Sequence, residues 1–149
     1  MTGERTDDPY RDIRDGVRAV CAQFPDAYFR RLDAERGYPD ELVAALTQAG
    51  WLAALIPAEY GGAGLGLAHA SVILEEINRC GANALACHGQ MYNMGTLVRH
   101  GSEEQKRRYL PAIAEGKLRL QSMGVTEPTA GTDTSAITTA AVRKATATS

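Results

Sequence analysis

The sequence predicts a mainly α-helical chain, with a helical domain over residues 1–117 followed by the first strands of an incomplete β domain over residues 118–149. Two observations lead to this prediction. Apolar residues recur every three to four positions through most of the first part, with helix-starting and helix-ending residues between the repeats. After Gly116 the apolar residues alternate with polar ones instead, which is typical of extended chain.

Composition narrows the range of functions. Sixteen basic residues against eighteen acidic ones give a formal net charge of -2, and no run of five like charges occurs, so neither a nucleic-acid partner nor a membrane-surface partner is expected. The odd number of cysteines and the lack of a C-x-x-C pair disfavour both a disulfide framework and a zinc site. The N-terminus lacks the apolar stretch of a signal peptide and is too acidic for a transit peptide, which predicts a cytoplasmic location.

Three helices are predicted in the first fifty residues. Asp8 caps the first helix, whose apolar residues recur at helical spacing until Pro25 interrupts them. A second short helix extends through Arg36. The third begins with the favourable turn Pro-Asp-Glu at residues 39–41 and ends at Gly50.

A glycine-rich segment follows at residues 61–66, and it must be a loop because glycines so closely spaced do not form a helix interior. The G-x-G-x-x-G pattern of a nucleotide-binding loop fails because Leu67 occupies the last glycine position. A structural turn is therefore favoured over a phosphate site. The next helix ends near Gly81, and we expect Glu75 and Glu76 on its exposed face.

Residues 80–98 contain no charged side chain, yet they carry several amides, a histidine and glycines. The segment is too polar to span a membrane, so it predicts a helix buried within the protein. Its polar side chains need partners, either neighbouring helices or a ligand cavity. His88 has no second ligand at helical spacing, so no metal site is predicted, and Cys80 with Cys87 is interpreted as a pair of small core residues on one helix face.

A capping box of Ser102 and Gln105 predicts the start of the last helix. Beyond it, residues 118–126 and 136–142 predict two strands joined by a turn. Two strands do not make a stable sheet alone.

Three segments resemble one family in order and at natural spacing. They are P-A-E-Y-G-G-A-G-L-G at residues 57–66, G-S-E-E-Q-K-R-R-Y-L-P at residues 101–111 and T-E-P-T-A-G-T-D at residues 126–133. Together they resemble the acyl-CoA dehydrogenases. The main departure is Thr132, which stands where the family has serine and keeps the hydroxyl.

The resemblance implies a bundle of helices followed by the first strands of a β-barrel domain, with FAD as the cofactor. It places Met123, Val125 and Thr126 against the flavin ring, where the amides of Val125 and Thr126 and the Thr126 hydroxyl would bond its polar edge near N5. Gly131 and Thr132 would lie near the flavin pyrophosphate and the CoA portion of the substrate.

The substrate implied is an acyl-CoA thioester. By the resemblance, Gln90, Asn93 and Met94 would line the acyl cavity, with Thr132 near the CoA portion. The reaction would be α,β-dehydrogenation, an oxidoreductase step of fatty acid metabolism, in which a carboxylate removes the α-proton and the β-hydrogen leaves as hydride. That catalytic carboxylate lies beyond this chain in the family, so none of the acids present is assigned to it.

For the full-length enzyme, the resemblance implies an electron-transfer flavoprotein or similar acceptor and a homotetramer. The chain alone is expected to be inactive. Two alternatives remain: a flavin oxidase or monooxygenase of the same fold, or a truncated, non-catalytic helical remnant.

The C-terminus suggests a shifted reading frame. Relatives typically continue Gly-Asp-x-Tyr-Val after the position of Lys144, whereas this chain continues Ala-Thr-Ala-Thr-Ser at residues 145–149. The codons GGC GAC CGC TAC GTC followed by G encode Gly-Asp-Arg-Tyr-Val, and loss of the first G gives GCG ACC GCT ACG TCG, which encodes Ala-Thr-Ala-Thr-Ser. We therefore hypothesise a single-base deletion, which the gene sequence would test.

Overall fold

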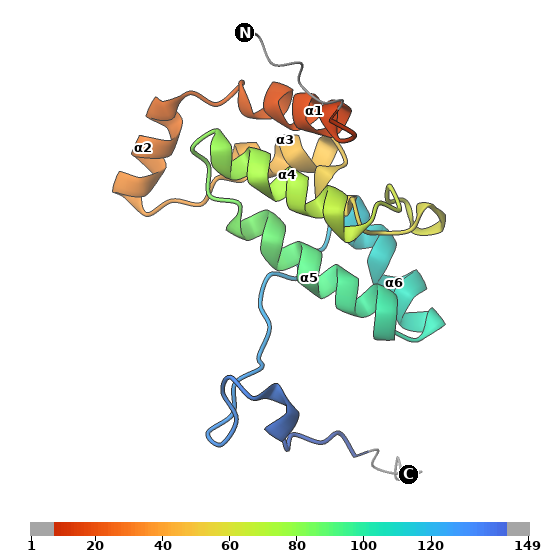
Figure 1. The fold of residues 1–149 in the computed structure, drawn as a ribbon. Helices are drawn as coiled ribbons and strands as arrows, with labels where there is room; N and C mark the ends of the chain where they lie inside the picture. The colour runs from red at the N-terminus through yellow and green to blue at the C-terminus, as the bar shows by residue number, and fades with distance from the viewer. Residues whose placement is uncertain (1–7, 143–149) are drawn as a thin grey trace, which may run out of the picture.

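A computed structural model describes residues 8–142 of the chain, and six α-helices account for most of this range (Figure 1). The mainly α-helical prediction is confirmed. Residues 145–149, on which the reading-frame hypothesis rests, lie outside the described residues. The helices are α1 (Arg11–Cys21), α2 (Asp26–Glu35), α3 (Asp40–Gln48), α4 (Leu67–Arg79), α5 (Leu85–His100) and α6 (Glu103–Ala114).

The helix ends follow local chemistry. Before the first helix, the Asp8 carboxylate accepts a hydrogen bond from the Tyr10 amide at 3.0 Å and forms a turn. Helix α1 therefore begins at Arg11, slightly later than predicted. Gly50 adopts a φ of 81° just beyond α3, a left-handed conformation that glycine takes without steric cost. The predicted capping box at α6 is present, with both hydrogen bonds between Ser102 and Gln105 formed.

The glycine-rich loop is a structural turn, as predicted. A Cβ added at Gly62 would lie 2.1 Å from the Ile56 carbonyl oxygen, so no larger residue fits there. The loop amides are used internally: Gly62 N donates to Pro57 O at 3.2 Å and Gly64 N to Ile56 O at 2.8 Å. These amides are therefore not directed at a phosphate.

The helices pack around one core. Helices α1 and α4 lie side by side and run in the same direction, while α5 packs against α4 and α6 (Figure 1). The largest fully buried side chains are mainly aliphatic and come from every helix except α2: Val17, Leu42, Leu52, Ile56, Ile73, Ile77, Met94, Leu110 and Ile113.

The two predicted strands are wrong for this chain. Within residues 8–142 there is an isolated antiparallel bridge between Glu127 and Ala130 but no strand, and Thr134–Ala136 forms a 3-10 turn. The tail instead runs away from the helical body as extended chain (Figure 1). A strand exists only when a neighbour completes its hydrogen-bond ladder, and the described residues offer the tail no neighbouring strand.

Candidate functional site

The tail is attached to the helical body along one side of α5. Tyr92 donates its hydroxyl to the Gln121 carbonyl oxygen at 3.1 Å, and Asn93 Nδ2 donates to the Leu120 carbonyl oxygen at 2.9 Å. Gly89 lies beneath the same segment, where an added Cβ would be 3.0 Å from the Gln121 oxygen and 3.3 Å from its Cα. Glycine at position 89 thus lets the tail backbone approach the helix closely.

An open groove of about 860 Å³ lies beside this attachment. One wall comes from α2 and the loop to α3, and the other comes from the start of α5 and the tail. The lining residues are Phe29, Arg30, Leu32, Asp33, Arg36, Gly37, Tyr38, Pro39, Leu42, Gly81, Asn83, Leu85, Ala86, Gln121 and Ser122. A groove with aromatic and aliphatic walls and charged groups at its rim suits a ligand with an apolar and a polar end.

One carboxylate closes the loop that contains the hydroxyl-rich turn at residues 126–133. The Glu127 carboxylate accepts hydrogen bonds from the Thr138 amide at 2.9 Å and from the Thr139 amide at 2.8 Å. It also accepts hydrogen bonds from both threonine hydroxyls. These hydrogen bonds, with the Thr139 hydroxyl contributing most, lower the pKa of Glu127 to about 2. The carboxylate therefore fastens the base of the loop.

The residues predicted to contact flavin are accessible on this tail. Met123 is 45% exposed and Val125 37% exposed, and Thr126 and Thr132 are also exposed. An added Cβ at Gly131 would meet no atom within 4 Å, so the backbone there is open to a ligand. Apolar side chains, free hydroxyls and an approachable backbone suit one edge of a flavin nucleotide, so the residues present fit FAD.

The residues predicted to line an acyl cavity differ in how deeply they are buried. Gln90 and Met94 are completely buried, and Gln90 Nε2 donates to the Leu52 carbonyl oxygen at 3.0 Å. Asn93 is half-buried and bonds the tail. None of the three lines the groove described above. Gln90 Oε1 is buried and has no hydrogen-bond partner among the described residues.

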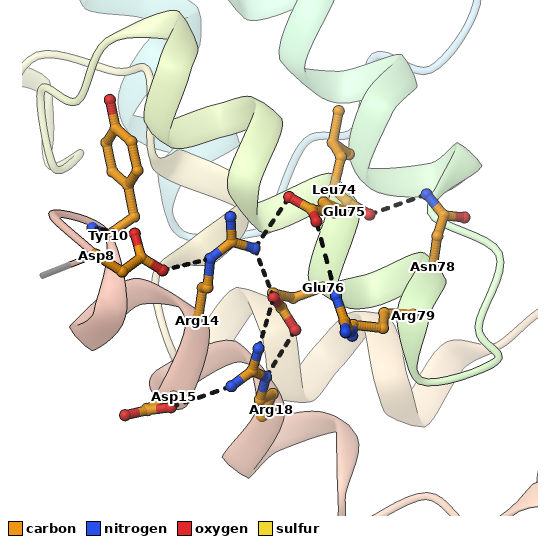
Figure 2. Close-up of polar contacts among 10 residues, drawn as sticks. All are labelled: Asp8, Tyr10, Arg14, Asp15, Arg18, Leu74, Glu75, Glu76, Asn78 and Arg79. Carbon is orange, nitrogen blue, oxygen red and sulfur yellow. Dashed lines mark hydrogen bonds and ion pairs between the residues drawn. The ribbon is translucent and has the colours of Figure 1, made fainter. Parts of the chain in front are cut away.

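Glu76 corrects another expectation. It was predicted on the exposed face of α4, but it is 1% exposed and faces α1, where two arginines enclose it (Figure 2). Arg14 Nη1 donates to it at 2.6 Å, and Arg18 donates through Nε at 2.8 Å and Nη2 at 2.9 Å. Glu75 remains half-exposed, as predicted, and bonds Arg14 at 2.9 Å. A buried carboxylate is tolerated here because its oxygens are satisfied by opposite charge.

The charges of this cluster reinforce one another. Hydrogen bonds from Arg18, and then from Arg14, lower the pKa of Glu76 against the opposing effect of burial. The carboxylate in turn raises the pKa of Arg14, so both groups stay charged. Arg14, Arg18 and Glu75 border a surface hollow of about 480 Å³. The two carboxylates, Glu75 and Glu76, balance the two arginines, so we interpret the cluster as a structural link between α1 and α4.

The cysteines are also arranged differently from the prediction. Cys80 directly follows α4 and Cys87 lies in α5, so they share no helix face. Burial raises the pKa of Cys87 to about 12, which suits the predicted core role. Among residues 8–142, no group of three His, Cys, Asp or Glu side chains is placed to hold a metal ion. No helix in that range is long and apolar enough to cross a membrane.

The fold and site together define a helical domain that carries an open groove and an appended hydroxyl-rich turn. Its sequence matches the family described as "Acyl-CoA dehydrogenase, N-terminal domain" over residues 7–117. The chain therefore belongs to the acyl-CoA dehydrogenase family, an oxidoreductase family, as the three motifs predicted.

Named relatives agree with this assignment. Acyl-CoA dehydrogenase FadE12 of Mycobacterium tuberculosis is 33% identical over 132 residues, which is 88% of this chain and 34% of that protein. Cyclohex-1-ene-1-carbonyl-CoA dehydrogenase of Geobacter metallireducens is 37% identical over 131 residues, or 87% of this chain and 34% of that protein. The chain thus spans about a third of the length of the curated relatives it matches.

A solved structure shows the same fold. A chain of the ChsE4-ChsE5 complex from Mycobacterium tuberculosis superposes with a TM-score of 0.70 at 32% identity, covering 95% of this chain and 36% of that one.

The groove was not predicted from the sequence. Its walls come from segments far apart in the chain, such as Phe29, Tyr38, Leu85 and Gln121, and none of these belongs to a motif. The only usable signal was the uncharged stretch at residues 80–98, which contributes one wall.

Proposed function

We propose that this chain forms part of a FAD-dependent acyl-CoA dehydrogenase that removes hydrogens from the α and β carbons of an acyl-CoA thioester. The observation that carries the proposal is the similarity to named acyl-CoA dehydrogenases that continues past the helical domain. An alignment covering 88% of the chain must extend beyond residue 117 wherever it begins, and so into the tail.

The tail would hold the flavin. Met123 and Val125 offer apolar contact to a planar ring, while the Thr126 hydroxyl and the amides of Val125 and Thr126 would donate hydrogen bonds to its polar edge. Gly131 and Thr132 would contact the pyrophosphate and the CoA portion, since the backbone is open there. When bound, FAD would accept the β-hydrogen as hydride.

Helix α5 would form one wall of the acyl site. Asn93 already links this helix to the tail, and Gln90 would support the wall from behind, because its completely buried side chain bonds the Leu52 carbonyl oxygen. Met94 would close the inner side of that wall, because it is completely buried. The carboxylate that removes the α-proton would come from the part of the relatives that this chain does not cover.

We also propose the wider setting that the family suggests. The full-length enzyme would act in fatty acid metabolism in the cytoplasm and assemble as a homotetramer. Its electrons would pass to an electron-transfer flavoprotein or a similar acceptor.

A chimera tests the proposal. Residues 8–142 would replace the matching part of FadE12, and the purified chimera should be yellow and lose its flavin absorbance when an acyl-CoA is added without oxygen. A folded chimera without flavin would contradict the cofactor assignment. Bound flavin that acyl-CoA does not reduce would contradict dehydrogenation, and rapid hydrogen peroxide formation would indicate an oxidase instead.

Thr126→Ala in the same chimera should slow flavin reduction about fivefold, the effect of losing a hydrogen bond of about 1 kcal/mol. Thr129→Ala is the control, because Thr129 lies in the same turn but has no proposed contact. Equal rates in both variants would refute the role given to Thr126.

A further inference from the structure

Two thiols lie at matching ends of neighbouring helices. Helix α1 ends at Cys21, and Cys80 is the residue directly after α4. Cys21 is 2% exposed, whereas Cys80 is half-buried and packs against the same core. No function described above uses either of them.

The register of the two helices places these cysteines opposite each other. At the other end of the pair, the rings of Tyr10 and His69 meet edge to face with centroids 5.2 Å apart. In the middle, Arg18 reaches Glu76 at 2.8 Å. Cys21 follows Tyr10 by as many residues as Cys80 follows His69, so parallel helices in this register bring the cysteines level.

The chemistry of the thiols agrees with this placement. Burial raises the pKa of Cys21 to about 12, and the adjacent Cys80 thiol contributes to that rise by hydrogen bonding. Cys80 Sγ also donates to the Ile77 carbonyl oxygen at 3.0 Å. Two neighbouring thiols become a disulfide when an oxidant removes both hydrogens and their Cα atoms can lie within about 4.4–6.8 Å of each other.

We propose that Cys21 and Cys80 are a redox modification site, at which a small disulfide such as oxidised glutathione joins the ends of α1 and α4 covalently. The Cys80 thiolate attacks one sulfur of oxidised glutathione and displaces a first glutathione thiolate. Cys21 then attacks the mixed disulfide at the Cys80 sulfur and gives up its proton to the departing second glutathione thiolate; this is the slow step, because the pKa of Cys21 is raised. Two protein thiols are oxidised, one glutathione disulfide is reduced, and the released thiolates take up the two protons.

The cross-link would act on the groove. Gly81 and Asn83 line its wall immediately after Cys80. Tying Cys80 to α1 therefore restrains the connection between α4 and α5 from which that wall is built. This consequence concerns the helical body itself and does not depend on bound flavin.

The test uses the 149-residue chain, whose described part contains the three cysteines. The native chain would be incubated with oxidised glutathione, its circular dichroism recorded, and its free thiols counted after denaturation. The count should fall from three to one. Peptide mass spectrometry should find Cys21 joined to Cys80, and the melting temperature should rise until dithiothreitol reverses it.

Cys87→Ser is the matched control and should still form the cross-link, leaving no free thiol. Cys80→Ser should leave Cys21 unmodified. The proposal is overturned if the folded wild-type chain keeps all three thiols, if glutathione remains on Cys80 without transfer to Cys21, or if Cys87 forms the cross-link instead. The wild-type peptide map decides the matter even if a variant fails to fold.

Discussion

Single residues hold the helical body together through charge as well as through apolar contact. Glu76 is the clearest case, because a carboxylate without solvent depends entirely on the arginines that enclose it. Its position could have been foreseen in part: it lies three residues after the buried Ile73 and next to the buried Ile77. It was nevertheless predicted to be exposed because it is charged and because its partners, Arg14 and Arg18, lie far away in sequence.

Glu76→Gln should lower the free energy of unfolding by about 2 kcal/mol. This is less than the 3–5 kcal/mol typical of a fully buried pair, because Arg14 and Arg18 are 20% and 50% exposed and can regain water. Urea unfolding would measure the change. Glu75→Gln, which removes a half-exposed charge beside the same arginine, should cost under about 0.5 kcal/mol, and equal losses in both variants would contradict the role of burial.

The same residue predicts a pH dependence. The pKa of Glu76 is lower in the folded chain than its ordinary value of 4.5, so its contribution is complete above that value and is lost as pH falls through the folded pKa. Unfolding free energies of the wild type and Glu76→Gln should therefore converge as the solution is acidified. A constant difference down to the lowest pH at which the chain stays folded would contradict this.

The Glu127 carboxylate should make the closure of its loop depend on pH. Because its pKa is about 2, the loop that it fastens should stay closed until pH approaches that value. At pH 4.5, amide exchange at Thr138 and Thr139 should be slower in the wild type than in Glu127→Gln, and the difference should disappear as the pH approaches 2. Asp133→Asn is the control, since that carboxylate bonds Ser135 and not the threonines. Equal exchange rates at Thr138 and Thr139 in the wild type and Glu127→Gln would show that Glu127 does not hold the loop.

At the scale of whole elements, the sequence predicted what depends on neighbours in the chain. The capping box at Ser102, the glycine turn at residues 61–66 and the end of α3 all rest on local chemistry, and the structure has them. The prediction of two strands was wrong because a strand depends on a partner distant in sequence, which residues 8–142 do not offer. The groove was not predicted for a similar reason, since it exists only when separate segments meet.

The attachment of the tail to α5 depends on Gly89. Gly89→Ala raises helix propensity by about 1 kcal/mol, but the new methyl would stand 3.0 Å from the Gln121 oxygen and force the tail to shift, so the tail should be held more weakly. Gly95→Ala brings the same gain on the same helix, where the nearest atom is 4.0 Å away. Limited proteolysis should cut near Gln121 faster in Gly89→Ala only. Equal cleavage of the two variants would mean that close approach is not what holds the tail.

At the scale of the molecule, the helical body and the tail differ in how fully they are supported. The body has its own buried core, whereas most of residues 122–142 of the tail are exposed. The 149-residue chain should therefore bind FAD weakly or not at all, because only one edge of the proposed flavin site belongs to it. Gel filtration with FAD would test this, and flavin remaining with the protein in equimolar amount would refute it.

The pairing of α1 with α4 has a consequence for synthesis. Tyr10 meets His69, and Arg18 meets Glu76, so α1 can pack against α3 during synthesis but lacks these contacts until α4 has been made. At the usual 5–20 residues per second, that interval lasts roughly 3–12 seconds. During it, the side of α1 that packs against α4 remains uncovered on the nascent chain, which gives a chaperone time to bind it.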